Sequence, residues 1–294
     1  MPQLQHASVN GVNIAYYERG QYSDDLPTLY FVHATGFHAR VWDEIIEAFP
    51  EYHVIAVEQR GHGRSDDVAV EHWKTFGEDQ RELALALGLS RAIGIGHSMG
   101  AHALIQGAAQ SQCFSRLLLL DPTVSSPEAY AEAPVDLFGG QLHPAAKRRD
   151  VFESVDEMLA QIREKSSFPL FKPRILEDYC KHGLLPRSDG KFRLACLPEV
   201  EARVYMSARS NGDIYNHVAK IDFPVRIIRA KQPNPDNLYD FSSSPTWSDL
   251  ASKFQHANDT QWPESTHFIP MQYPDRVIDL INSEVELWQT QRSG

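Results

Sequence analysis

Residues 93–104, which read IGIGHSMGAHAL, decide the fold of this chain. They combine an apolar run typical of a buried strand, a turn flanked by Gly96 and Gly100, and a run of small and apolar residues that favours a helix. A sharp turn between a strand and a helix forces its central residue into a strained conformation that exposes the side chain, and it needs small neighbours where the two elements nearly touch. This pattern predicts that Ser98 is a nucleophile. The alternative is an ordinary turn that contains an inert serine.

The composition of the chain is that of a folded protein. Of its 294 residues, 42% are hydrophobic and 23% are charged, so we expect one large α/β core with an insertion. The net charge of −11 leaves no polybasic surface, and nucleic acid is therefore not expected as a partner. No apolar run reaches the ~20 residues that span a bilayer, and residues 1–6 do not resemble a signal peptide. We expect no membrane partner and a cytoplasmic location.

Cysteine and histidine patterns do not point to a metal. The three cysteines are widely spaced with no Cys-x-x-Cys pair, which is typical of reduced thiols. None of the 13 histidines falls in a His-Glu-x-x-His arrangement. We expect neither a metal ion nor a cofactor.

Strands and helices alternate on both sides of the Ser98 turn. This alternation predicts a mostly parallel, doubly wound sheet with helices on both faces. The expected elements are a hairpin of residues 4–9 and 12–18 around Asn10-Gly11, strands at 29–32, 54–57, 91–95 and 116–122, and helices at 41–49, 74–87 and 101–110.

The alternation stops between residues 124 and 221. This stretch contains amphipathic segments separated by prolines and no clear buried strand, so we interpret it as a helical cap over the carboxyl edge of the sheet. Strands at 224–230 and 257–262 and a helix at 274–289 then complete a core domain of residues 1–123 and 222–294. Five apolar residues of the cap either line an acyl pocket or form its own core: Phe138, Phe152, Leu159, Phe168 and Phe171.

A serine hydroxyl is a poor nucleophile at neutral pH, so Ser98 needs a general base and donors for the oxyanion. His267 is the predicted base. It lies in a loop between the last strand and the last helix, which returns to the carboxyl edge of a doubly wound sheet. The alternative is a structural loop histidine.

Four motifs, taken together and in order, resemble the α/β-hydrolase superfamily. They are residues 33–36 (HATG) followed by Trp42, residues 60–65 (RGHGRS), residues 96–100 (GHSMG), and His267 near the C-terminal end. The resemblance covers nearly the whole chain except the cap. It implies a serine hydrolase of α/β-hydrolase fold with a helical cap and no cofactor.

The resemblance also implies an oxyanion hole. Its donors would be the backbone N–H groups of Met99 and Thr35. The family usually has His-Gly where this chain has His33-Ala34. The Thr35 hydroxyl could be a third donor or could cap the loop.

The carboxylate that should orient His267 is missing from its usual place in the family. A Gly-x-x-Asp pattern normally follows the strand at 224–230, but residues 230–233 read AKQP. Asp240 lies 27 residues before His267, close to the separation in the family, and is the preferred acid. Asp121 follows the strand after the nucleophile helix, where dehalogenase-like members carry their acid, and is the alternative. Asp236 is a further candidate.

These residues predict a carboxylesterase that acts on small-molecule esters with short or medium acyl chains, through an acyl-enzyme intermediate. Carbon–carbon bond hydrolysis, lactone or thioester hydrolysis and cofactor-free perhydrolysis remain open because they use the same triad. Epoxide hydrolases and haloalkane dehalogenases are disfavoured, since they have an aspartate in place of Ser98. A ligand-binding receptor without turnover is the alternative of a different class. A homodimer also remains open.

Overall fold

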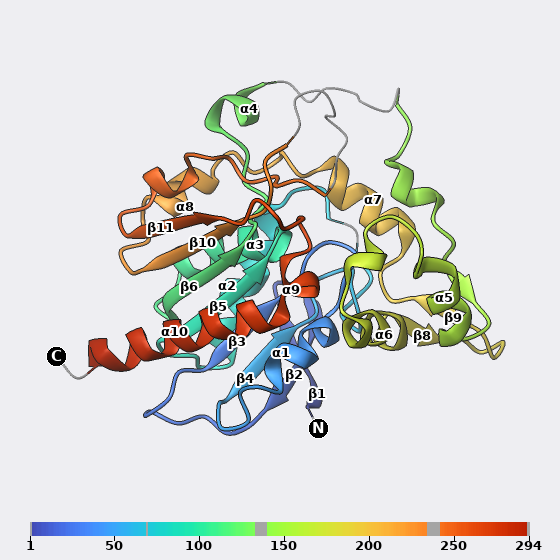
Figure 1. Cartoon of the computed structure of the whole chain (residues 1–294), viewed down its shortest axis with the longest axis horizontal. Helices are drawn as coiled ribbons and strands as arrows, with labels where there is room; N and C mark the ends of the chain where they lie inside the picture. Colours follow the sequence, from blue (N-terminus) through green and yellow to red (C-terminus); the bar gives the residue numbers. More distant parts are fainter. Residues whose placement is uncertain (1, 69, 133–139, 234–241, 293–294) are drawn as a thin grey trace.

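The computed structural model describes residues 2–68, 70–132, 140–233 and 242–292. Its centre is an eight-stranded sheet (Figure 1), in which β1 and β2 pair antiparallel, β2 joins β4 antiparallel, and all pairs from β4 to β11 are parallel. The mostly parallel, doubly wound sheet predicted from the sequence is therefore confirmed. In spatial order the strands are β1 (Gln3–Val9), β2 (Val12–Arg19), β4 (Val54–Val57), β3 (Leu29–Val32), β5 (Ala92–His97), β6 (Phe114–Leu120), β10 (Val225–Arg229) and β11 (Ala257–Gln261).

Helices cover both faces of this sheet (Figure 1). Successive side chains of a strand point to opposite faces, so Phe31 packs in one apolar cluster with α10 (Pro274–Arg292), while Tyr30 packs in another with α2 (Lys74–Ala86) and α3 (Met99–Ala109). Burial on both faces explains why the central strands are continuous apolar runs. Among the helices of the described ranges, none combines the length and apolar character needed to cross a bilayer.

The helix expected at residues 41–49 is shorter than predicted. The chain forms a single 3₁₀ turn, η1 (Ala39–Trp42), and one α-turn, α1 (Asp43–Ile46), and turns follow before Pro50. The residue before a proline is disfavoured in the helical region, which accounts for an early end. The loop after β10 holds another 3₁₀ turn, η4 (Leu250–Lys253).

Residues 124–221 contain more than helices. They also include a three-stranded antiparallel sheet, which the sequence pattern did not predict, because these strands have only two or three residues, too few to show an alternating pattern. The expectation concerned buried strands, and most residues of these three strands are not buried. Prolines that separate the amphipathic segments occupy the first helical position of several helices. The elements are α4 (Pro127–Ala131), η2 (Pro144–Lys147), β7 (Val151–Phe152), α5 (Val155–Ile162), η3 (Phe168–Leu170), α6 (Pro173–His182), β8 (Leu184–Pro186), β9 (Phe192–Leu194), α7 (Pro198–Met206) and α8 (Ile214–Val218).

This inserted segment packs onto the core. Figure 1 shows α5, α6, β8 and β9 grouped beside the sheet, in yellow-green. Phe152, Phe171 and Ile175 belong to the same apolar cluster as β3 and α10. The division of the chain into a core domain and a cap domain at residues 123 and 221 stays a prediction.

The turn between β5 and α3 has the strained conformation expected from its glycines. Ser98 has φ 56° and ψ −119°, outside the regions that L-residues favour. A Cβ at Gly96 would lie 2.6 Å from the Cα of Ala101, and one at Gly100 would overlap the backbone carbonyls of Val32 and His33. The close approach of α3 to β3 therefore requires glycine at position 100.

We expect Gly100→Ala to reduce the free energy of unfolding by about 1 to 3 kcal/mol, because backbone atoms on both sides would have to separate. Urea unfolding measures this effect. The control is Gly11→Ala, where φ is +77° but a Cβ would meet nothing within 4 Å, so it measures backbone strain alone. Equal stability of Gly100→Ala and wild type would contradict this packing argument.

Candidate active site

The structure brings Ser98, His267 and Asp121 together in one chain of hydrogen bonds. Ser98 lies between β5 and α3, His267 lies in the loop before α9 (Ile269–Gln272), and Asp121 follows β6. The Nε2 atom of His267 is 2.9 Å from Ser98 Oγ, and its Nδ1 atom is 2.7 Å from Asp121 Oδ2. Asp121 is fully buried, whereas the His267 side chain is 14% exposed. These three residues have the arrangement of a nucleophile, a base and an orienting acid.

The hydrogen bonds assign the positions of the protons. A carboxylate can only accept, so the Nδ1–H of His267 donates to Asp121. The Nε2 atom of the neutral imidazole then accepts, and the Ser98 hydroxyl donates to it. In this tautomer His267 can take a proton from Ser98.

Asp121 is held by donors from three other positions. Its Oδ1 atom accepts from the backbone N–H of Ala230 at 3.1 Å, from the hydroxyl of Thr246 at 3.2 Å and from the hydroxyl of Ser244. Its φ of +48° is in the left-handed region, which aspartate tolerates better than most residues. The loop after β10, where the family usually carries its acid, therefore supplies donors to the carboxylate at the end of β6.

The other proposed acids are not in the described part of the chain. Asp240, preferred from the sequence, and Asp236 both lie within residues 234–241, outside the described residues. Asp121, the alternative, is the aspartate that makes the hydrogen bond to His267. The ranking of Asp240 above Asp121 rested on sequence separation, which does not measure distance in the fold.

Two backbone N–H groups are available beside Ser98. Within the described ranges, neither the N–H of Thr35 nor that of Met99 donates to a protein acceptor. The neighbouring Gly36 N–H donates instead to His62 Nε2 at 3.0 Å, which fixes the loop after β3. The Thr35 hydroxyl donates to the sulfur of Met99 at 3.3 Å, so it links the two predicted oxyanion residues.

Buried neutral histidines surround this centre. His97 Nε2 donates to the backbone carbonyl of His267 at 2.7 Å, and His102 Nδ1 donates to the carbonyl of Thr123 at 2.9 Å. Burial lowers the pKa of His97 to about 3 and the pKa values of His62 and His102 to about 4. These side chains therefore stay uncharged at neutral pH and hold the backbone of the site.

The loop that carries Thr35 is covered by an ion pair from the inserted segment. Arg148 pairs with Glu201 and donates through Nη2 to the Tyr179 hydroxyl at 3.1 Å. A Cβ at Gly36 would lie 2.7 Å from Glu201 Oε1, so this carboxylate rests directly on the loop. Isolated charged residues in a helical segment give no sequence signal, and the sequence did not predict this ion pair.

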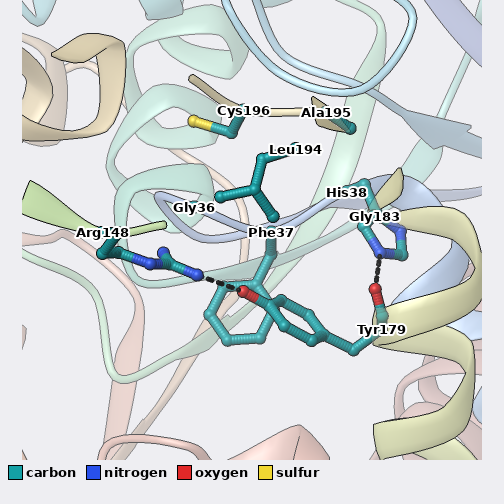
Figure 2. Close-up of a pocket in the computed structure, with 9 residues that line it drawn as sticks. All are labelled: Gly36, Phe37, His38, Arg148, Tyr179, Gly183, Leu194, Ala195 and Cys196. Atoms are coloured by element: carbon teal, nitrogen blue, oxygen red, sulfur yellow. Dashed lines mark hydrogen bonds between the residues drawn. The ribbon is translucent and has the colours of Figure 1, made fainter. Parts of the chain in front are cut away.

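Beside the ion pair is a cavity of about 10 Å³, enough for one water molecule. Figure 2 shows the Arg148 guanidinium reaching across it to Tyr179, whose carbonyl accepts from His38 Nε2 at 3.1 Å. The cavity lies between the loop after β3 and the inserted segment, and residues of both line it. Its lining residues are Gly36, Phe37, His38, Arg148, Tyr179, Gly183, Leu194, Ala195 and Cys196.

Aromatic rings form an apolar wall next to His267. The ring centroids of Phe37 and Phe171 are 6.1 Å apart, those of Phe171 and Phe268 are 5.4 Å apart, and Phe268 adjoins His267. Phe152 and Phe171 are buried in the main apolar cluster, with Leu159 and Phe168 partly buried against it, which favours the core alternative for these four residues. Phe138 lies outside the described residues.

A metal ion has one candidate position within the described ranges. Ligand atoms of Asp43, Asp178 and His182 lie within 4.8 Å of one another. Asp43 is already bound by Arg40 Nε at 2.7 Å, so part of the negative charge is compensated. The cluster is separate from the chain of Ser98, His267 and Asp121.

Comparison with known proteins identifies the family of this chain. The model of the alpha/beta hydrolase family matches residues 29–280. A non-heme chloroperoxidase of Streptomyces lividans is 40% identical over 94 residues, which are 31% of this chain and 33% of that protein, so the match spans about a third of its length.

Solved structures share the fold. An E-2-(acetamidomethylene)succinate hydrolase superposes with a TM-score of 0.72 at 19% identity, covering 96% of this chain and 98% of that one. The peroxisomal α/β-hydrolase Lpx1 of Saccharomyces cerevisiae gives 0.73 at 18% identity, covering 99% and 89%. At these identities the likeness shows the fold alone. Because the family model matches most of its length, this chain belongs to the α/β-hydrolase family, a family of hydrolytic enzymes.

Proposed function

We propose that this protein is a serine hydrolase that cleaves carboxylic esters, with Ser98 as nucleophile, His267 as general base and Asp121 as the orienting acid. The observation that carries the proposal is the chain of hydrogen bonds from Asp121 through His267 to Ser98. The N–H groups of Thr35 and Met99, which donate to no acceptor in the described part of the chain, support it, because acyl transfer needs donors for an oxyanion.

In this mechanism Ser98 Oγ attacks the ester carbonyl while His267 Nε2 takes its proton. The Asp121 carboxylate stabilises the imidazolium, and the N–H groups of Met99 and Thr35 stabilise the oxyanion. His267 then returns the proton to the leaving alcohol. Water, deprotonated by His267, attacks the acyl-enzyme, and His267 gives that proton to Ser98 as the acid product leaves.

The apolar wall supports an apolar acyl group of short or medium length. Phe268 adjoins His267, and the rings of Phe37 and Phe171, which belong to the core cluster, pack behind Phe268. Such rings favour hydrocarbon over charged groups. Small-molecule esters are therefore the substrate class that we propose.

The test combines a fluorophosphonate probe with p-nitrophenyl esters of increasing chain length. We expect the probe to label Ser98, identified by peptide mass, and the turnover to be highest with short or medium acyl chains. Ser98→Ala is the control that should not react. If the folded wild-type protein neither binds the probe covalently nor hydrolyses any ester, it is not a serine esterase, and a ligand-binding receptor becomes the better hypothesis. Faster turnover of thioesters, lactones or carbon–carbon substrates would instead select one of those activities.

Perhydrolysis is a second candidate, favoured by the similarity to a non-heme chloroperoxidase over 94 residues. Here hydrogen peroxide replaces water in the attack on the acyl-enzyme, so that a peracid is released and Ser98 regains its proton from His267. Peracid production from acetate esters with added hydrogen peroxide measures this activity. A ratio of peracid to acid no higher than in the same mixture without the protein would exclude perhydrolysis.

A further inference from the structure

The hydroxyl of Thr123 contacts Ser98 Oγ directly, in addition to the contact that His267 makes with the same oxygen. Its Oγ1 atom is 3.1 Å from Ser98 Oγ, and the Thr123 backbone N–H donates to the Ser98 carbonyl at 3.2 Å. Thr123 follows Asp121 by two residues, so the acid and this hydroxyl leave β6 on the same short loop. Both the backbone and the side chain of Thr123 therefore bridge to Ser98.

The direction of the hydrogen bond between the two hydroxyls follows from the other partners. The single proton of Ser98 Oγ is donated to His267 Nε2, because His267 uses its own proton for Asp121. The proton between Ser98 and Thr123 must then come from Thr123. We infer that Thr123 is a hydrogen-bond donor to the reacting oxygen of Ser98, an inference that rests on the function proposed above.

A buried network holds Thr123 in place. Its carbonyl accepts from His102 Nδ1–H at 2.9 Å, and His102 Nε2 accepts from the Asn211 amide at 3.0 Å. The same amide donates to Gln106 Oε1 at 2.9 Å. His102 and Gln106 lie on α3, whereas Asn211 lies in the inserted segment, so two parts of the fold position this hydroxyl.

A donor at this position acts when negative charge develops on Ser98 Oγ. During attack the oxygen loses its proton to His267, and during breakdown of the acyl-enzyme it leaves as an alkoxide before His267 returns the proton. Hydrogen bonds to charged groups are stronger than those to neutral groups, so Thr123 stabilises the transition states more than the resting hydroxyl. Thr123 keeps its own proton throughout.

The test is Thr123→Val, which replaces the hydroxyl with a methyl group of similar shape. We expect kcat to fall about 10- to 100-fold, the range of one hydrogen bond to a charged group, with KM within about twofold of wild type. The rate of Ser98 labelling by a fluorophosphonate should fall by a similar factor. Thr123→Ser, which keeps the hydroxyl, should restore both rates to within about threefold, whereas a merely structural effect of the threonine would not be rescued.

The matched control is Thr28→Val. Thr28 is also buried and its hydroxyl also makes one hydrogen bond, 2.9 Å to His53 Nδ1, but it precedes β3 at the opposite end of the strand. It should lower the melting temperature without changing kcat. If Thr123→Val does not fold, Thr123→Ala removes the same hydroxyl without adding a methyl group to the site.

Three results would overturn the inference: kcat and labelling within twofold of wild type in a folded Thr123→Val, equal losses in Thr123→Val and Thr123→Ser, or absence of labelling in the wild type. A wild type that is labelled but hydrolyses no ester would contradict only the proposed function, because the labelling rates still test Thr123.

Discussion

Asp121→Asn is expected to lower kcat for ester hydrolysis by about 10⁴-fold in a protein that still folds. The Oδ1 atom of Asp121 accepts from three donors, so the amide oxygen of the asparagine must take its place. The amide nitrogen then faces His267 Nδ1 and donates to it. This forces the imidazole proton onto Nε2. A protonated Nε2 atom cannot accept the proton of Ser98.

The matched comparison is Asp240→Asn, since Asp240 was the preferred acid from the sequence. We expect its kcat to stay within a few-fold of wild type, with circular dichroism and thermal unfolding confirming that both variants fold. A large loss in Asp240→Asn together with an active Asp121→Asn would transfer the role of acid to Asp240. Full activity in both variants would refute a triad that contains either residue.

Acidification from pH 7.5 to pH 5.5 is expected to reduce the free energy of unfolding by several kcal/mol. Burial lowers the pKa of His38 and His97 to about 3 and that of His62 and His102 to about 4, well below the usual value near 6.5. The unfolded chain therefore binds these protons at a higher pH than the folded chain. This stability is fully present above about pH 6.5 and is lost as the pH falls towards the folded pKa values of about 3 to 4. Between pH 7.5 and pH 5.5 the loss is about 1 kcal/mol per histidine.

Several carboxyl groups act in the opposite direction, because burial raises their pKa values: Glu44, Glu58, Asp79, Asp178 and Glu201. Burial and the nearby Asp43 raise the pKa of Asp178 to about 6, so the folded protein takes up a proton there before the unfolded chain does. Asp178 is partly exposed, so its contribution is smaller than that of the four histidines together. The net effect of acid is still destabilising.

Urea unfolding at pH 7.5, 6.5 and 5.5 measures this dependence. His38→Gln is the control, because the glutamine amide can replace the donor that His38 Nε2 offers to the Tyr179 carbonyl but does not titrate. The slope of the unfolding free energy against pH reports how many protons are taken up on unfolding. This number should be lower by up to one in the variant. Stability that does not change between pH 7.5 and 5.5 would show that these histidines are not neutral and buried.

The sequence determined the strands of the main sheet, the turn around Ser98 and the succession of strands and helices along the chain. Local rules are enough for these features. Strands buried on both faces are continuous apolar runs, and Asn10-Gly11 adopts the positive φ values of a hairpin turn. Glycine is required at position 96, where β5 approaches α3, and at position 100, where α3 approaches β3. The short strands β7, β8 and β9 escaped detection because two or three residues show no periodicity.

Only the tertiary structure decided which groups meet at Ser98. Asp121 is 146 residues from His267 along the chain and 2.7 Å from it in space, because neighbouring parallel strands bring their carboxyl ends to the same edge of the sheet. The hydroxyl of Thr123 and the carboxylate of Glu201 reach the site in the same way, through strand order and through the packing of the inserted segment. Such contacts depend on distances between segments, which sequence spacing does not encode.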